Sequence, residues 1–258
     1  MILNTTQRMN NLYYGLGDRV VAFSTRRQGG VSKGNYASLN VNPFCGDNSR
    51  DVATNRGLLA AELGIPSSHI VFPHQVHGTM SCKVTEPCAP EGVDALFTDV
   101  PGLCVAVSTA DCIPVLLYDP ARPAVAAIHA GWRGTVADIV SKTMHCMVRE
   151  LGVVPSRMRA VIGPGIGVDA FEVGDEVYDA FADAGFPMQQ IAVRRDKWHI
   201  DLPASNAWRL RECGVENIHL SGMCTFSQPD EFFSARRLGI HSGRIISGIM
   251  IKGRGGQD

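Results

Sequence analysis

Three side chains that can bind a metal or take part in nucleophilic catalysis lie beside apolar runs of this 258-residue chain. His77 follows the apolar triplet 70–72, Cys112 lies in a turn between two apolar runs, and His129 lies at the end of the second run. One thiolate and two imidazoles match the three protein ligands of a catalytic zinc site, whose fourth position stays open. The separations of 35 and 17 residues differ from the clustered ligands of a zinc finger. Spacing alone is weak evidence, because a histidine at a strand end is more often a packed side chain.

The same residues allow other readings. His74 and His77 form an HxxH pair, and on a strand they would point to opposite faces, so only one of them can enter a shared site. Cys112 could instead be a nucleophile with His129 or His77 as its base, which would make a cysteine hydrolase or amidase. A binding module without catalysis is a third reading. We favour the metal site because a catalytic pair leaves one histidine without a role.

Composition limits the partners and the compartment. With 45% hydrophobic and 19% charged residues, a net charge of −1 and a pI near 6.7, the chain gives no electrostatic reason to expect nucleic acid or a membrane as partner. Its first 20 residues lack the pattern of a signal peptide, and no apolar run reaches the roughly 20 residues that span a bilayer. Eight scattered cysteines without a CxxC pair indicate reduced thiols, so we expect a cytoplasmic protein.

Four apolar segments in the middle of the chain should position the three side chains. Their apolarity is continuous rather than alternating, which predicts strands covered on both faces. Connections as short as those between them join antiparallel neighbours, so we expect one buried antiparallel or mixed sheet. The segments are 94–99, 103–109, 113–119 and 124–130.

Helices and further strands flank this sheet. A helix over about 50–63 should be capped by Asp47, Asn48 or Ser49 and end at Gly64, and a helix over 135–152 should end at Gly152. The remaining predictions are helices at about 174–184 and 203–213 and strands at 20–23, 158–162, 216–220 and 243–252. The class is α+β. We expect a single domain over 1–258, because we find no repeat, low-complexity tract or linker.

Several motifs extend the analysis beyond single residues. They are QVHG (75–78), TADCIPVLLYD (109–119), HAGWRG (129–134), IGPGIGVDAFEVGDEV (162–177) and, further out, RRQGGVSKGNYASLN and CTFSQPDEFFSARR. In this order they resemble the YfiH-like family, which was named for a polyphenol oxidase (laccase) activity and is understood as purine nucleoside phosphorylases. The resemblance covers most of the chain. It implies an α-β-β layered fold similar to that of a bacterial toxin deamidase.

The resemblance implies a zinc site formed by His77, Cys112 and His129, with His74 as a neighbour. It also implies phosphorolysis of adenosine, inosine and methylthioadenosine to free base and ribose 1-phosphate, together with deamination of adenosine. Purine nucleosides and inorganic phosphate are then the partners, and the oligomeric state is not predicted. Copper chemistry is disfavoured, because a multicopper oxidase needs several ions held largely by HxH pairs, and this chain has none.

Basic residues beside glycines suit a phosphate group. The candidates for substrate binding are Arg27, Gly29, Gly30, Arg133, Glu172 and Arg236. For proton transfer the nearest carboxylates are Asp111, adjacent to Cys112, and Glu172, although Asp111 could equally cap a turn and Glu172 the start of a helix. Trp132 and Phe171 are candidate stacking surfaces for a purine, although buried aromatic residues are more often part of a core.

The chain departs from the family pattern at three places. Gly165 and Asp169 stand where many relatives have cysteines, which argues against a metal or redox role for that loop. Ala235 replaces an aromatic residue, so stacking at that position is lost.

The H-x-E and P-C-x-x-C signature of cytidine-type zinc deaminases is missing, so a deaminase site here would have a different geometry. Editing of peptidoglycan precursors, which has been proposed for the family, fits the hydrolytic alternative.

Overall fold

The computed structural model describes residues 10–253 and confirms the α+β class, with two stacked sheets covered by helices. The ends of the expected domain, 1–9 and 254–258, lie outside the described residues. The five-stranded sheet has the order β1 (Leu12–Tyr14), β2 (Val20–Ser24), β14 (Ile245–Ile251), β6 (Cys104–Thr109) and β3 (Ile70–Val71). The six-stranded sheet has the order β13 (Asn217–Leu220), β9 (Arg159–Ile162), β7 (Ile113–Asp119), β8 (Ala124–Ala130), β5 (Ala95–Thr98) and β4 (Ser81–Lys83).

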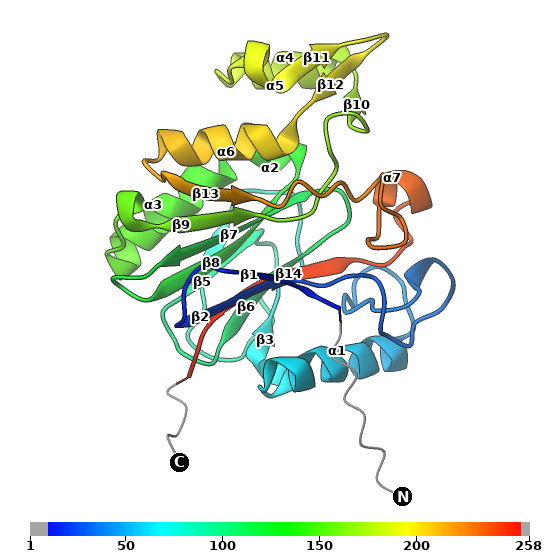
Figure 1. Cartoon of the computed structure of the whole chain (residues 1–258), viewed down its shortest axis with the longest axis vertical. Helices are drawn as coiled ribbons and strands as arrows, with labels where there is room; N and C mark the ends of the chain where they lie inside the picture. Colours follow the sequence, from blue (N-terminus) through cyan, green and yellow to red (C-terminus); the bar gives the residue numbers. More distant parts are fainter. Residues whose placement is uncertain (1–9, 254–258) are drawn as a thin grey trace, which may run out of the picture.

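Both sheets are mixed. In the five-stranded sheet only the β3–β6 pair is parallel, and in the six-stranded sheet the β13–β9 and β4–β5 pairs are parallel. A third sheet, with the order β10 (Glu172–Val173), β12 (Trp198–Ile200) and β11 (Ala192–Arg194), projects from one end together with α4 (Asp175–Asp183) and α5 (Met188–Ile191) (Figure 1).

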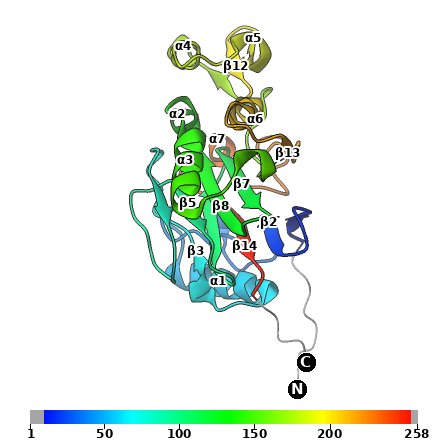
Figure 2. The ribbon, with the colours of Figure 1, turned by 90° about the vertical axis from the view of Figure 1, so that its left-hand side faces the viewer.

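Helices cover the outer face of each large sheet (Figures 1 and 2). Helix α1 (Ser49–Leu63) packs on the five-stranded sheet, where Leu59 joins a core with Phe23 and Ala106. Helices α3 (Ile139–Leu151) and α6 (Leu202–Glu212) pack on the six-stranded sheet. The two sheets share a core between them, which includes Leu116 and Val107. The three implied layers, α-β-β, are present as α1, the five-stranded sheet and the six-stranded sheet. Helices α3 and α6 form a fourth layer on the outer face of the six-stranded sheet.

The stacking of the two sheets explains why apolar and polar residues do not alternate along these strands. Within β7, Val115 faces the helices while Leu116 faces the second sheet, and every residue of the strand is buried. The expectation that the short connections join antiparallel neighbours holds for β7 and β8. It is wrong for the two earlier connections, because β6 belongs to the other sheet and the chain crosses between the layers on either side of it. A strand is buried on two faces whether the next strand along the chain pairs with it or belongs to the other sheet, so hydrophobicity does not distinguish these two arrangements.

The predicted helix ends are confirmed at α1, where Asn48 accepts hydrogen bonds from two backbone amides and Gly64 adopts the left-handed conformation at φ 67°. The predicted helix over 135–152 is interrupted. Asp138 takes φ 67° and caps α3 through Ser141, so a short α2 (Trp132–Val136) precedes it. The remaining short elements are α7 (Ala235–Leu238) and the 3-10 turns Gly34–Tyr36, Ser67–His69 and Pro155–Arg157. No helix within residues 10–253 is both long and apolar enough to cross a bilayer.

Candidate metal centre and active-site cavity

The structure brings His77, Cys112 and His129 together. One potential ligand atom from each lies within 4.8 Å of the others, and the two imidazole rings meet edge to face with their centroids 4.8 Å apart. Cys112 lies in the segment 110–112 that crosses from β6 to β7, and the register of β7 with β8 brings this segment beside the end of β8. His77 reaches the same place from the loop after β3, where its backbone takes φ 60°.

The ring of His129 is oriented by a buried carboxylate. Its Nδ1 lies 2.8 Å from Oδ1 of Asp94, which leaves Nε2 as the free ring nitrogen on the side of Cys112 and His77. Metal-bound histidines usually donate the other ring N–H to such a partner, which fixes the tautomer. This arrangement matches the usual surroundings of a metal-bound histidine.

The charges in the cluster also suit a metal ligand set. Burial by itself would raise the pKa of Cys112, but the charge and hydrogen bonds of His129 and His77 outweigh it and lower this pKa to about 6. Burial by itself would lower the pKa of His129, yet Cys112 and Asp94 together raise this pKa to about 9. At neutral pH these pKa values favour a thiolate beside an imidazolium in the metal-free site, and a metal cation can take the place of the imidazolium proton.

A glycine leaves room for the cluster. A Cβ atom added to Gly131 would lie 3.0 Å from Sγ of Cys112 and 3.2 Å from Cδ2 of His77. A larger residue at this position would push the two candidate ligands away. The donor set and this space fit zinc, which prefers tetrahedral coordination by sulfur and nitrogen and keeps an open position in catalytic sites.

The three residues line a cavity of about 650 Å³. Its wall also includes Phe171, which directly precedes β10, Arg236 of α7, Asn42 and His74. A cavity of this size is typical of small-molecule sites. His74 stacks on Phe44 with the ring centroids 4.4 Å apart and stands outside the cluster of three, as the resemblance implied.

Two of the expected substrate residues, Arg236 and Glu172, lie close together, and one of them lines the cavity. Arg236 lines it, donates from its guanidinium to the carbonyl oxygen of Glu172 and lies 5.6 Å from the centre of the Phe171 ring. The side chain of Glu172 is exposed and pairs with Lys197 at 2.8 Å. Both oxygens of Asp111 have partners, since they accept from Thr225 Oγ1 and from the backbone of Arg236 at 2.7 Å.

The other expected substrate residues are placed elsewhere. Arg27 donates to the carbonyl oxygens of Ala37 and Pro229, and a Cβ atom on Gly30 would lie 2.2 Å from the carbonyl oxygen of Ser38. These contacts hold the loop that also contains Gly29, and none of its three candidates lines the cavity. Arg133 is exposed and stacks over Trp132 at 4.4 Å, and neither of these two residues lines the cavity.

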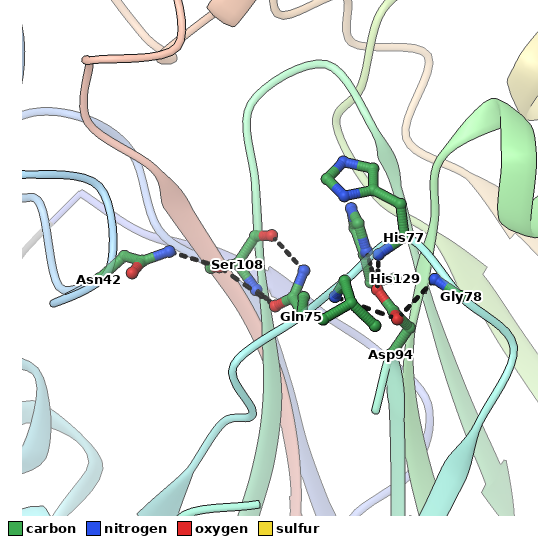
Figure 3. Close-up of polar contacts among 8 residues, drawn as sticks. Asn42, Gln75, His77, Gly78, Asp94, Ser108 and His129 are labelled. Carbon is green, nitrogen blue, oxygen red and sulfur yellow. Dashed lines mark hydrogen bonds and ion pairs between the residues drawn. The ribbon is translucent and has the colours of Figure 1, made fainter. Parts of the chain in front are cut away.

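Three polar residues of the site were missed by sequence reasoning (Figure 3). Gln75 donates to the carbonyl oxygen of Ser108 and accepts from its backbone N–H, so its amide continues the hydrogen bonding of β3 along β6. Asn42 donates to the hydroxyl of Ser108. Asp94, a third, accepts four hydrogen bonds. The one signal for it in the sequence was a charged residue at the start of an apolar segment.

The comparisons with known proteins agree with these features. Residues 21–252 match the family model described as multi-copper polyphenol oxidoreductase laccase. A purine nucleoside phosphorylase from Bacteroides thetaiotaomicron is 46% identical over 244 residues, which cover 89% of this chain and 90% of that protein. Adenosine deaminase RL5, from an unknown prokaryotic organism, is 41% identical over 251 residues and covers 90% of this chain and 94% of its own length.

A solved structure shares the fold. The crystal structure of hypothetical protein YfiH from Bacillus licheniformis superposes with a TM-score of 0.87 at 33% identity, covering 90% of this chain and 93% of that one. These matches confirm the resemblance drawn from the motifs. The chain is an enzyme that belongs to the multi-copper polyphenol oxidoreductase laccase family, and within it to the YfiH type.

Proposed function

We propose that the protein is a zinc-dependent purine nucleoside phosphorylase that also deaminates adenosine. The observation that carries the proposal is the cluster of His77, Cys112 and His129 at the wall of a 650 Å³ cavity. Relatives named for these two activities match about nine-tenths of the chain. We further propose that the chain acts as a single domain in the cytoplasm, in keeping with its eight free cysteines.

The ligands favour zinc over copper. One thiolate and two imidazoles hold one ion, whereas the family's laccase label would require several coppers with mostly histidine ligands. When bound, zinc supplies a Lewis acid and lowers the pKa of a coordinated water to about 7. The residues His77, Cys112 and His129 would hold it, with Nε2 of His129 as the ligand atom.

Phosphorolysis replaces the purine at C1′ of the ribose by phosphate, so the site must hold an anion next to a nucleoside. Among the described residues, Arg236 and Arg244 are the arginines that line the cavity. The guanidinium of Arg244 is taken up by carbonyl oxygens, including those of Ser242 and Ile240. Within residues 10–253, the guanidinium of Arg236 donates only to the carbonyl oxygen of Glu172. We therefore assign phosphate to Arg236 and the face of the purine to Phe171 beside it.

The test combines metal analysis with product analysis. Protein purified without a metal-affinity column should contain one zinc per chain and should release free adenine from adenosine only when phosphate is supplied, with ribose 1-phosphate as the second product. Cys112→Ala should lose both the zinc and the phosphorolysis. Cys88→Ala, which removes an exposed cysteine outside the site, should keep both. A Cys112→Ala variant with the full rate would contradict the proposal.

A cysteine hydrolase is the second candidate, and the lowered pKa of Cys112 next to His129 favours it. The two functions can be distinguished by whether the activity depends on phosphate and on the metal. A hydrolase would act without phosphate, and alkylation of the metal-free protein would abolish its activity. The phosphorylase should depend on phosphate and should regain activity when zinc is restored to the unmodified protein.

A further inference from the structure

Asp94 is a fully buried carboxylate whose hydrogen bonds all go to the segments that carry the two histidines (Figure 3). Oδ1 accepts from Nδ1 of His129 at 2.8 Å and from the backbone N–H of His77 at 2.9 Å. Oδ2 accepts from the backbone N–H groups of Val76 at 3.2 Å and Gly78 at 2.7 Å. One side chain thus connects two of the three candidate metal ligands.

The fold places this carboxylate by backbone pairing. Asp94 directly precedes β5, which pairs with β8, and its carbonyl oxygen accepts from the N–H of His129 at 2.8 Å. Its own N–H donates to the carbonyl oxygen of Met80 at 2.9 Å, on the chain that follows the His77 loop. The backbone of Asp94 is therefore fixed on both sides before its side chain makes any contact.

We infer that Asp94 is a positioning residue that sets the geometry of the metal site by holding both histidines. It fixes His129 with Nε2 free for the ion. It also stabilises the loop at His77, whose φ of 60° is sparsely populated by residues other than glycine. The inference rests on the proposed zinc site and concerns how that site is preorganised, so it can fail while the proposed function stands.

Asp94→Asn tests this role with little change in shape. A carboxylate offers acceptors on both oxygens, whereas an amide has one oxygen and an NH2 group that only donates. In either orientation of the amide, two of the four donors lose their acceptor and face an N–H group instead. If the amide oxygen stays with His129 and His77, the N–H groups of Val76 and Gly78 are unpaired. The opposite orientation releases His129 and His77.

Asp119 offers a matched control. It is equally buried, and its carboxylate accepts from the backbone N–H groups of Ala121, Arg122 and Val154 at 2.9 to 3.1 Å. It lies at the end of β7 that is remote from Cys112. Asp119→Asn therefore also replaces a buried carboxylate that accepts backbone hydrogen bonds, without touching either histidine.

The measurement is zinc affinity, from competition with a chromophoric chelator, for the unaltered chain and the two variants. Loss of such a partner typically weakens metal binding about 10- to 100-fold, and we expect this for Asp94→Asn, with Asp119→Asn unchanged. Equal affinity of Asp94→Asn and the unaltered chain overturns the role of Asp94, as does an equal loss in both variants. If the unaltered chain binds no zinc, the proposed metal site fails as well.

A second measurement needs no variant and so does not depend on the folding of Asp94→Asn. Long-range 1H–15N spectra of the histidine side chains in the zinc-loaded protein report which nitrogen of each ring binds the ion. We expect His129 to carry its proton on Nδ1, toward Asp94, and to bind zinc through Nε2. Zinc on Nδ1 of His129 would overturn the inference, because Asp94 could not then orient the ring.

Discussion

The surroundings of the cysteines in this chain shift their pKa values in opposite directions. Burial raises the pKa of Cys104, which lies within β6, to about 12, and it also raises the pKa of Cys45. Burial acts on Cys112 in the same direction, but two imidazoles outweigh it and lower the pKa of this thiol to about 6. The difference comes from the neighbours rather than from the residue type. Cys112 should therefore be a reactive thiol when the metal is absent.

In the metal-free protein we expect iodoacetamide to modify Cys112 readily at pH 7, because a pKa of about 6 keeps it mostly as the thiolate. As the pH falls through about 6 the thiolate is protonated, and the rate should fall with it. Zinc should protect Cys112. Peptide mapping by mass spectrometry gives the labelled fraction, with Cys104 as the internal control that stays unmodified. Equal labelling with and without zinc would count against a metal-bound thiolate.

The site residues divide by how much the sequence says about them. His77, Cys112 and His129 stand in motifs, and their types alone indicate a metal site or a nucleophile. Asp94 could not be found in this way, because its role depends on a contact with His129 across 35 residues of chain. That contact exists only once β5 pairs with β8. The substrate residues are harder still, since Arg27 has the same local pattern of glycines as a phosphate loop but uses its guanidinium to hold backbone carbonyls.

At the scale of elements, the sequence predicted the features that depend on neighbouring residues, namely helix ends and buried strands. The ends of α1 follow from a capping side chain and a glycine, and the buried strands follow from continuous apolarity. The assignment of β6 to the other sheet did not follow. It depends on pairing with β14, which lies more than a hundred residues later in the chain. The kink at Asp138 was also missed, because an aspartate in the left-handed conformation resembles any polar residue within a helical pattern.

Two glycines of the α1 region test the position of the helix end, because replacing them by alanine should change the free energy of unfolding in opposite directions. Gly57 lies inside α1 and Gly64 caps its end at φ 67°, and an added Cβ meets nothing within 4 Å at either position. Gly57→Ala should raise the free energy of unfolding by up to about 1 kcal/mol, because alanine is the better helix former. Gly64→Ala should lower it by about 1 kcal/mol, because the left-handed conformation disfavours a side chain. Urea unfolding measures both changes, and equal signs would contradict the assigned helix end.

At the scale of the molecule, the site forms where separate segments meet at one end of the two stacked sheets. The crossing segment 110–112 supplies Cys112, the loop after β3 supplies His77, and the loop after β9 packs against the crossing segment. Gly165 in this last loop lies so close that its Cβ would be 2.3 Å from Cδ1 of Ile113 and 3.1 Å from the carbonyl oxygen of Asp111. The loop therefore supports the backbone on which Cys112 stands.

We expect Gly165→Ala to lower the free energy of unfolding by about 1–3 kcal/mol, as overpacking of an interior does, and to reduce phosphorolysis by displacing the Cys112 segment. Ile113 is fully buried, so its side chain cannot move aside freely. Gly167→Ala is the matched control, since its Cβ would make ordinary contacts with Cys224 at 3.4 Å. Urea unfolding and the rate of adenine release should both separate the two variants. If Gly165→Ala is as stable and active as Gly167→Ala, the loop after β9 does not support the site, and the position of Cys112 must depend on the β7–β8 pairing alone.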